Sequence, residues 1–501
     1  MKRIFLLGVL IFATTLLINA QESRTTLVER VELDINDEAV SNFEVISLAQ
    51  KGLINVYSQR ESSKGRKWTF KKMDINLTEV DKEEITISKK YRFVSSYVTK
   101  THFHAMFRMK SKAFKIVSLE LETMRVKVVD SELPKAFLME KMVVIGENAV
   151  IDTKTRKEAF LTVINWSTGR SKIIPINVDG ANAKRIFFQN FQVLSDESEL
   201  FAFVTARADK KTDTYVIRVD RKGNKKKIFC LTEKYENVIS DISVSKMENE
   251  EFIYTGTYSE KNATYSNGLF FAKSIGSELK FIESYNFLNL NKFLEYLPAR
   301  KQAKVERKQK RKEKRGKEMN INYLIASHDI IKKGDKYIML GEAYYPTYRT
   351  ETRTDANGNV TYQRIFDGYQ YTHAVVAGFD KDGGLIWDNS FQLFPPYKPF
   401  HVKRFISVSE ANEKEVQLVF SAGRTIYSKT IDNFNGKTLD EKESEIISTG
   451  DEDDKLTWSA TAETDYWYER NFITYGYQKI KNKSGDKKRK RKVYYINKIQ
   501  Y

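Results

Sequence analysis

The segment GFDKDGGLIW at residues 378–387 contains a tight turn between two short apolar stretches. The Asp-x-x-Gly within it supplies the polar side chain and the glycine that tight turns favour. A second copy, VDRKG, is found at residues 219–223. A strand, a turn and a second strand therefore follow one another at both places, and this succession predicts antiparallel β-structure.

Short stretches of this kind extend along the whole chain. They are rich in Val, Ile, Phe and Tyr, and turn residues separate them; examples are residues 53–57, 91–98, 160–166, 200–205, 251–258 and 415–422. Helical periodicity is nearly absent. The sequence therefore predicts an all-β, antiparallel protein.

The predicted strands fall into groups that repeat about every 45–50 residues. The groups begin near residues 43, 92, 136, 186, 237, 323, 400 and 456. A repeat of this length with about four strands per unit is typical of propeller blades. We therefore expect a β-propeller of seven or eight blades, with stacked β-sandwiches as the alternative fold.

The segment 378–387 resembles the turn-and-tryptophan signature of quinoprotein-like propeller repeats. The resemblance covers these ten residues clearly. It implies a propeller fold in which Trp387 packs between neighbouring blades. It implies no cofactor, because such repeats mostly bind none, and we expect none here.

The two ends of the chain are predicted to share a blade. The segment 27–35 (LVERVELDI) alternates apolar and polar residues, whereas the last unit offers only three strands, at 458–462, 468–478 and 493–499. We expect the first strand to complete the last blade, with Leu27, Val31, Leu33 and Ile35 facing inward. This pairing would remove the open sheet edges.

Residues 21–501 are expected to form one propeller domain that two insertions interrupt. The first spans 289–320; after Pro298 it is basic and has no apolar face, so we expect a frayed helix or a disordered arm. The second is a projecting β-hairpin at 344–366, where Asn357-Gly358 is a strong two-residue turn signal.

The first twenty residues have the pattern of a secretory signal peptide. Lys2 and Arg3 precede an apolar run that ends near Ala20, and this run is short for a membrane-spanning helix. We therefore expect a mature chain that begins at Gln21 and acts in the periplasm or at the outer membrane of a Gram-negative cell. Cys230 is the one cysteine, so no internal disulfide forms, and we expect its side chain to be buried.

The formal net charge of +18 is concentrated in two segments. Residues 300–317 carry 11 Lys or Arg and two Glu, and residues 479–492 carry nine Lys or Arg and one Asp. The rest of the mature chain is nearly neutral. Outside the cytoplasm such segments are suited to anionic lipid or lipopolysaccharide, whereas export argues against nucleic acid as the partner.

No catalytic or metal-binding motif is present. His102 and His104 share one face of a predicted strand, but a metal needs at least one more ligand, so half-exposed strand histidines are the simpler interpretation. Asp355-x-Asn357-x-Asn359 and the acidic run 451–454 each offer oxygens to calcium. The first is more simply a hairpin turn, and the second is a solvated loop that would suit a basic segment.

The region 344–400 is unusually aromatic, with 13 aromatic residues in 57. Tyr369, Tyr371 and His373 alternate along one predicted strand face. Exposed tyrosines mark interfaces, although β-structure also uses tyrosine as core filler. The predicted interaction residues are Tyr344, Tyr345, Tyr348, Tyr369, Tyr371 and His373 in this region, and Arg307, Lys310, Arg311, Lys312 and Arg315 in the first basic segment.

These observations predict a non-enzymatic binding or scaffold module of the bacterial cell envelope. Its expected partner is an outer-membrane or periplasmic protein complex. The alternative is a glycan-binding protein or a glycan-active enzyme of the envelope. Such an enzyme would need two carboxylates about 5–10 Å apart across a cleft.

Overall fold

The computed structural model describes residues 26–35, 40–61, 65–109, 113–132, 141–208, 211–260, 264–354, 360–395, 397–445, 449, 451–484 and 490–500. Within these ranges the chain forms eight antiparallel sheets. We call the sheets blades 1–8 in chain order. The predicted signal peptide, residues 1–20, lies outside the described residues.

Blades 1–4 each contain four consecutive strands. These are β2 (Val40–Ser47), β3 (Leu53–Glu61), β4 (Gly65–Met73) and β5 (Glu79–Ser88); β6 (Arg92–Val98), β7 (His102–Arg108), β8 (Ala113–Glu120) and β9 (Val126–Glu132); β10 (Met142–Ile145), β11 (Asn148–Lys154), β12 (Ala159–Asn165) and β13 (Ser171–Pro175); and β14 (Ile186–Val193), β15 (Glu199–Ala208), β16 (Lys211–Asp220) and β17 (Lys225–Cys230).

Blades 5–8 have the same pattern with two differences. Blade 6 contains an additional short strand, and the fourth strand of blade 8 is the N-terminal strand β1. The strands of blades 5–8 are β18 (Val238–Lys246), β19 (Glu251–Ser259), β20 (Gly268–Ile275) and β21 (Glu278–Asn286); β22 (Leu324–Ser327), β23 (Ile331–Lys333), β24 (Lys336–Thr354), β25 (Val360–Phe379) and β26 (Leu385–Gln392); β27 (Ser407–Val408), β28 (Glu415–Ala422), β29 (Thr425–Asp432) and β30 (Thr438–Glu445); and β31 (Asp454–Tyr468), β32 (Asn471–Asn482), β33 (Lys490–Gln500) and β1 (Thr26–Asp34).

Helical structure is sparse in the described part of the chain. One α-helix, α2 (Ala299–Glu313), follows blade 5, and short 3-10 turns occupy Ala49–Lys51, Ala183–Arg185 and Phe287–Asn289. None of the described helices is both long and apolar enough to cross a membrane.

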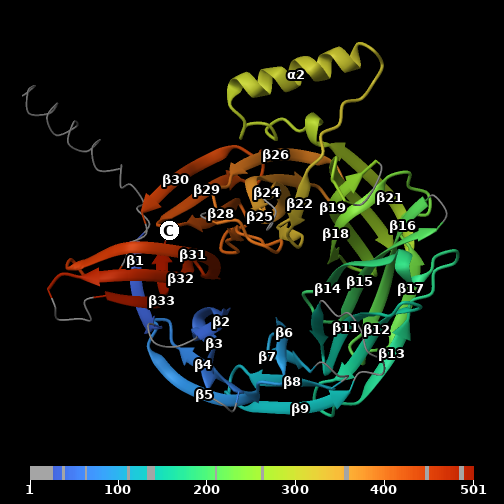
Figure 1. Cartoon of the computed structure of the whole chain (residues 1–501). Helices are drawn as coiled ribbons and strands as arrows, with labels where there is room; N and C mark the ends of the chain where they lie inside the picture. Colours follow the sequence, from blue (N-terminus) through green and yellow to red (C-terminus); the bar gives the residue numbers. More distant parts are fainter. Residues whose placement is uncertain are drawn as a thin grey trace, which may run out of the picture.

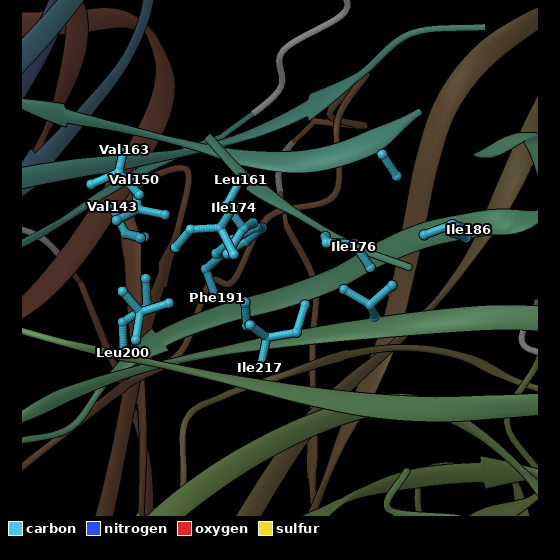
Figure 2. Packing of buried hydrophobic residues seen from close by; sticks show 14 of the residues in the cluster. Val143, Val150, Leu161, Val163, Ile174, Ile176, Ile186, Phe191, Leu200 and Ile217 are labelled. Carbon is cyan, nitrogen blue, oxygen red and sulfur yellow. The ribbon is translucent and has the colours of Figure 1, made fainter. Parts of the chain in front are cut away.

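Apolar side chains between consecutive blades form the core. Figure 2 shows one such cluster, in which Val150 and Leu161 of blade 3 meet Leu200 and Ile217 of blade 4. Equivalent clusters join all the remaining pairs of neighbouring blades. Blade 8 is joined to blade 1 in the same way, and Tyr494 packs there with Leu53. The blades therefore form the ring seen in Figure 1. This confirms the predicted propeller, with eight blades, and the stacked sandwiches are wrong.

The N-terminal strand β1 completes blade 8. It pairs antiparallel with β33, with Leu33 opposite Tyr494. Val31 and Leu33 pack against the cluster between blades 8 and 1, and Ile35 is buried within it. Val28 instead is 40% exposed, and it lies where the ladder shifts register between Leu27 and Glu29.

The turn at residues 380–384 links the last two strands of blade 6. The carboxylate of Asp380 accepts hydrogen bonds from the backbone N–H groups of Asp382 (2.9 Å) and Gly384 (2.8 Å). Trp387 follows and is buried, and its Nε1 donates to the carbonyl of Asn433 in blade 7 at 2.8 Å. Trp387 therefore packs between neighbouring blades, as the sequence predicts.

Cys230 is half-buried at the end of β17 and forms no disulfide, so the expectation of a fully buried side chain is only partly met. Burial raises the pKa of its thiol, with a smaller contribution from Asp213. A raised pKa disfavours the thiolate, and the side chain therefore has the character of a structural cysteine.

Candidate functional site

A two-stranded ribbon extends beyond the body of blade 6. Strands β24 and β25 pair from Tyr337↔Phe379 to Thr354↔Val360. Their pairing with the other neighbours, β22 and β26, stops opposite Tyr344 and His373. Residues 345–354 and 360–372 therefore pair mainly with each other. We call this part the ribbon. Asp355, Asn357 and Asn359, weighed above for calcium, lie outside the described residues.

The ribbon carries exposed aromatic side chains. Tyr345 and Tyr348, both predicted to interact, are exposed, and Tyr362 on the opposite strand is 75% exposed. The guanidinium of Arg364 lies 4.6 Å from the ring centroid of Tyr348. Tyr362 was missed, although it alternates with polar residues next to the Asn-Gly turn in the sequence.

The ribbon base is held by the segment between β26 and β27. The backbone N–H of Tyr369 donates to the carbonyl of Pro399 at 2.9 Å, and the ammonium of Lys398 lies 2.9 Å from the carboxylate of Asp367. The exposed ring of Phe400 packs edge-on against Phe366. Phe400 thus adds to the aromatic surface of the ribbon, and we call the exposed rings Tyr345, Tyr348, Tyr362 and Phe400 the ribbon patch; Tyr345 lies on the other face of the ribbon from Tyr348 and Phe400.

Two of the predicted interaction residues belong to the core. Tyr371 is 2% exposed and His373 is 0% exposed. They also occupy opposite faces: Tyr371 packs against Phe405 of the blade 6–7 cluster, whereas His373 stacks on Tyr296 with ring centroids 3.7 Å apart. The prediction of a shared face assumed strict alternation along the strand. Ala343 pairs with His373 and the next residue, Tyr344, pairs with Tyr371, so a β-bulge between Tyr371 and His373 breaks this alternation.

Tyr344 and Tyr369 are half-buried at the ribbon base. Their rings meet edge to face at 5.1 Å, and Tyr344 also packs against Tyr371 at 5.3 Å. Of the six residues predicted to interact in this region, Tyr345 and Tyr348 are therefore well exposed, Tyr344 and Tyr369 are partly so, and the other two are core.

The predicted basic residues Arg307, Lys310, Arg311 and Lys312 lie on α2, and Arg315 lies in the turn that follows. No residue of α2 is buried. The expected frayed helix or arm is thus a regular helix of 15 residues, and its side chains are exposed or partly exposed. In Figure 1 α2 lies outside the ring, beyond β26, whereas the labels of β24 and β25 lie inside it, so the two predicted surfaces are not shown side by side.

The second basic segment is largely part of blade 8. Residues 479–482 end β32 and residues 490–492 begin β33, while 485–489 lie outside the described residues. Arg491 forms ion pairs with Asp454 (2.5 Å) and Glu32 (3.0 Å). The acidic run 451–454 therefore does meet a basic segment, but Arg491 is a structural residue and not a free cation.

The inner strands line the centre of the ring and link neighbouring blades through polar side chains. Figure 1 shows β2, β6, β14 and β18 nearer the centre than β5, β9, β17 and β21. The hydroxyl of Ser96 in β6 donates to the carboxylate of Glu44 in β2 at 2.7 Å. Burial raises the pKa of Glu44, and the charge of Asp465 in β31 adds to this increase.

Asp465 belongs to a second polar group at the centre. The hydroxyl of Tyr475 donates to its carboxylate at 2.5 Å, and burial raises the pKa of Asp465. The ammonium of Lys403, on the segment before blade 7, lies 2.5 Å from the carboxylate of Glu463. Sequence reasoning missed these residues, because no local pattern brings β2 next to β31.

A cavity of about 580 Å³ lies beside the ribbon base. Its lining includes Lys141, Asp241, Tyr344, Lys403 and Arg404. The carboxylate of Asp241 accepts a hydrogen bond of 3.3 Å from the backbone N–H of Ser327, and burial raises its pKa. This cavity is polar and carries charges of both signs.

Within the described ranges, no three His, Cys, Asp or Glu side chains are placed to hold a metal ion. His102 is half-exposed, as expected, but His104 is buried, which corrects the expectation for that residue.

No protein-family model matches the chain, and no curated protein matches it in sequence. Among solved structures it is similar to the polysaccharide lyase Uly1 (9% identity, TM-score 0.40, 81% of this chain and 89% of that one). It is similar to prolyl oligopeptidase B from Galerina marginata, with 10% identity and a TM-score of 0.40, and the match covers 88% of this chain and 56% of that one. It is also similar to the propeller domain of the trilobed protease from Pyrococcus furiosus, with 9% identity and a TM-score of 0.34, and the match covers 81% of this chain and 96% of that one.

Proposed function

We propose that this protein is a non-enzymatic binding or scaffold module of the bacterial cell envelope, and that its partner is an outer-membrane or periplasmic protein. The observation that carries the proposal is the ribbon patch, with Tyr345, Tyr348 and Tyr362 exposed on a ribbon that projects from a rigid blade. Tyrosine rings supply a large contact area at low entropic cost, and aromatic residues are enriched in protein interfaces.

Export of the protein to the cell envelope is part of the same proposal. A basic head, an apolar run and Ala20 support export and cleavage before Gln21. The quinoprotein-like character of the repeat is likewise a proposal, supported by the turn at Asp380 and the buried Trp387.

We also propose that α2 contacts anionic lipid or lipopolysaccharide. Its basic residues are free of any buried role, and each Lys or Arg near an anionic membrane contributes about 1 kcal/mol. Flotation with phosphatidylglycerol vesicles tests this proposal, since a variant without residues 300–317 should float less than the whole protein, and equal flotation would contradict it.

Co-purification from native membranes in mild detergent tests the protein-binding proposal. The triple variant Tyr345→Ala, Tyr348→Ala and Tyr362→Ala should lose a partner that the wild type retains. Val80→Ala, Val128→Ala and Leu439→Ala together form a matched control, because these exposed apolar residues lie on the outer strands of other blades. Equal recovery of partners by all three proteins would refute the role of the ribbon patch.

The glycan-active alternative has one specific observation in its favour. Glu44 and Asp465 lie close enough for the charge of one to raise the pKa of the other, and a raised pKa suits a general acid. If the centre of the ring cleaves glycans, Glu44→Gln and Asp465→Asn should each abolish the release of reducing ends from envelope polysaccharide. Activity that survives both substitutions would exclude this site.

A further inference from the structure

A cavity of about 520 Å³ opens where blades 2, 3 and 4 meet. Its lining comes from the turns between first and second strands, such as Thr101 and Gly146, and from those between third and fourth strands, such as Trp166 and Arg221. The ribbon is a connection between second and third strands. In an antiparallel blade these two sets of turns lie at opposite ends, so the cavity and the ribbon open on opposite faces of the ring.

Three rings gather on one wall of this cavity. Trp166 lies 4.9 Å from both His102 and His104, and the two imidazoles are stacked with centroids 5.6 Å apart. The indole Nε1 donates to the carbonyl of Gly146 at 3.0 Å, which fixes the orientation of the ring. The wall therefore offers an indole ring of fixed orientation, tilted by 47° and 55° against the two imidazoles.

Both imidazoles are anchored through the same nitrogen. Nδ1 of His102 is 2.9 Å from the hydroxyl of Thr101, and Nδ1 of His104 is 2.8 Å from the hydroxyl of Ser118. His104 is 1% exposed. Within the part of the chain that the structure describes, Nε2 of neither ring has a hydrogen-bond partner. Nε2 of the half-exposed His102 is thus available to a ligand, whereas the buried His104 supports the stack of rings.

The charges in this cavity balance. Glu147 and Glu197 oppose Arg221 and Lys222. Burial lowers the pKa of His104 to about 3 and also lowers that of His102, so both rings are neutral at ordinary pH. The balance of charge favours a neutral ligand over an ion, and the polar lining suits a ligand with many hydroxyl groups.

We propose that this cavity binds a neutral saccharide unit, with the C–H face of the sugar on Trp166 and a hydroxyl group at Nε2 of His102. A neighbouring cavity of about 910 Å³ shares Thr99 and Thr101 with the first and is lined by Tyr466 and Tyr468. The shared residues place the two cavities side by side, which points to an oligosaccharide of neutral sugars as the ligand. This inference does not depend on the ribbon or its partner.

Isothermal titration calorimetry of the whole mature protein tests the inference, with cellobiose, maltose and N,N′-diacetylchitobiose as probes. At least one should bind with a Kd below 10 mM. His102→Ala and Trp166→Ala should each weaken this binding at least tenfold. Trp458→Ala, which removes an exposed tryptophan from blade 8, should leave it unchanged.

The melting temperature of each variant separates binding from folding, and Trp166→Phe, which keeps an aromatic ring, should restore part of the affinity if Trp166→Ala is unstable. No heat of binding from any of the three sugars at 10 mM would overturn the proposal. Binding that survives His102→Ala in a folded protein would do the same, as would preferential binding of inorganic phosphate or zinc ion.

Discussion

Arg491 in the last strand donates a hydrogen bond of 3.0 Å from Nε to the carboxylate of Glu32 in the first strand, across 459 positions of sequence. The same guanidinium pairs with Asp454 at 2.5 Å. The two carboxylates come from opposite ends of the chain, so one arginine joins β1, β31 and β33. Electrostatics therefore support the closure that apolar packing establishes.

Asp454 should give the protein an acid-sensitive component of stability. The hydrogen bond from Arg491 lowers the pKa of Asp454 to about 2, below the value of about 3.9 in an unfolded chain. A depressed folded-state pKa contributes stability above pH 4 that is lost as the pH falls toward 2. Between pH 5 and 2.5 the unfolding free energy of the wild type should fall by roughly 2 kcal/mol more than that of Asp454→Asn, measured by urea unfolding. Parallel decreases would contradict this.

The inward face of β1 should be essential for ring closure. Val31 and Leu33 pack between blades 8 and 1, whereas Val28 is exposed. Val31→Asp with Leu33→Asp introduces two charges into an apolar interface and should lower the urea midpoint strongly, nearly as much as deletion of residues 27–35. Val28→Asp, the control, should change the unfolding free energy by less than about 0.5 kcal/mol. Wild-type unfolding of the double variant would refute closure by β1.

Removal of residues 300–317 should leave folding intact. No residue of α2 is buried, so the deletion exposes little apolar area and removes repulsion among basic side chains. We expect the melting temperature to stay within about 2 °C. Phe293→Ala, just before the helix, is the contrast, because this ring is fully buried and its loss should cost about 3–5 kcal/mol. A large decrease on deletion would mean that α2 packs on the ring.

Substitution by alanine should reduce stability by different amounts at two glycines that have similar backbone conformations. Gly436 (φ 69°) and Gly423 (φ 65°) both lie in the left-handed region. A Cβ at Gly436 would lie 2.6 Å from the Cβ of Trp387, whereas one at Gly423 would meet nothing within 4 Å. Gly436→Ala should therefore destabilise the protein by at least about 1 kcal/mol more than Gly423→Ala, through a clash between blades. Equal urea midpoints would show that Trp387 can move aside.

His373 should make the protein less stable in mild acid. Burial lowers its pKa to about 3, whereas an unfolded histidine has a pKa of about 6.5. The unfolded state therefore takes up the proton first, and stability falls as the pH drops below 6.5. Between pH 7.5 and 5 the unfolding free energy of His373→Phe should fall by about 2 kcal/mol less than that of the wild type. An unchanged pH dependence would indicate that His373 is protonated in the folded state.

The sequence predicted the fold well because strand alternation and turn chemistry are local. Blade starts expected near 92, 186, 237 and 323 correspond to strands that begin at Arg92, Ile186, Val238 and Leu324. The turn at Asp380 and the burial of Trp387 follow from ten contiguous residues.

The candidate sites were predicted less well because they depend on register and on distant strands. One bulge moves Tyr371 and His373 to opposite faces, and nothing in their alternation reveals it. Glu44 meets Asp465 only because the ring closes. Trp166 joins His102 and His104 across two blades, and a single sequence does not show which blade faces which turn.

The position of β1 has a consequence for biosynthesis. Its ladder partner is β33, and Glu32 and Arg491 in the two strands are 459 positions apart, so β1 leaves the ribosome long before β33 and must wait for it. At about 5–20 residues per second, this delay lasts on the order of tens of seconds. During that time blades 1–7 can form in order, while β1 remains a strand without its partner. The charged residues of this strand, Glu29, Arg30, Glu32 and Asp34, then protect the waiting segment from pairing with other chains.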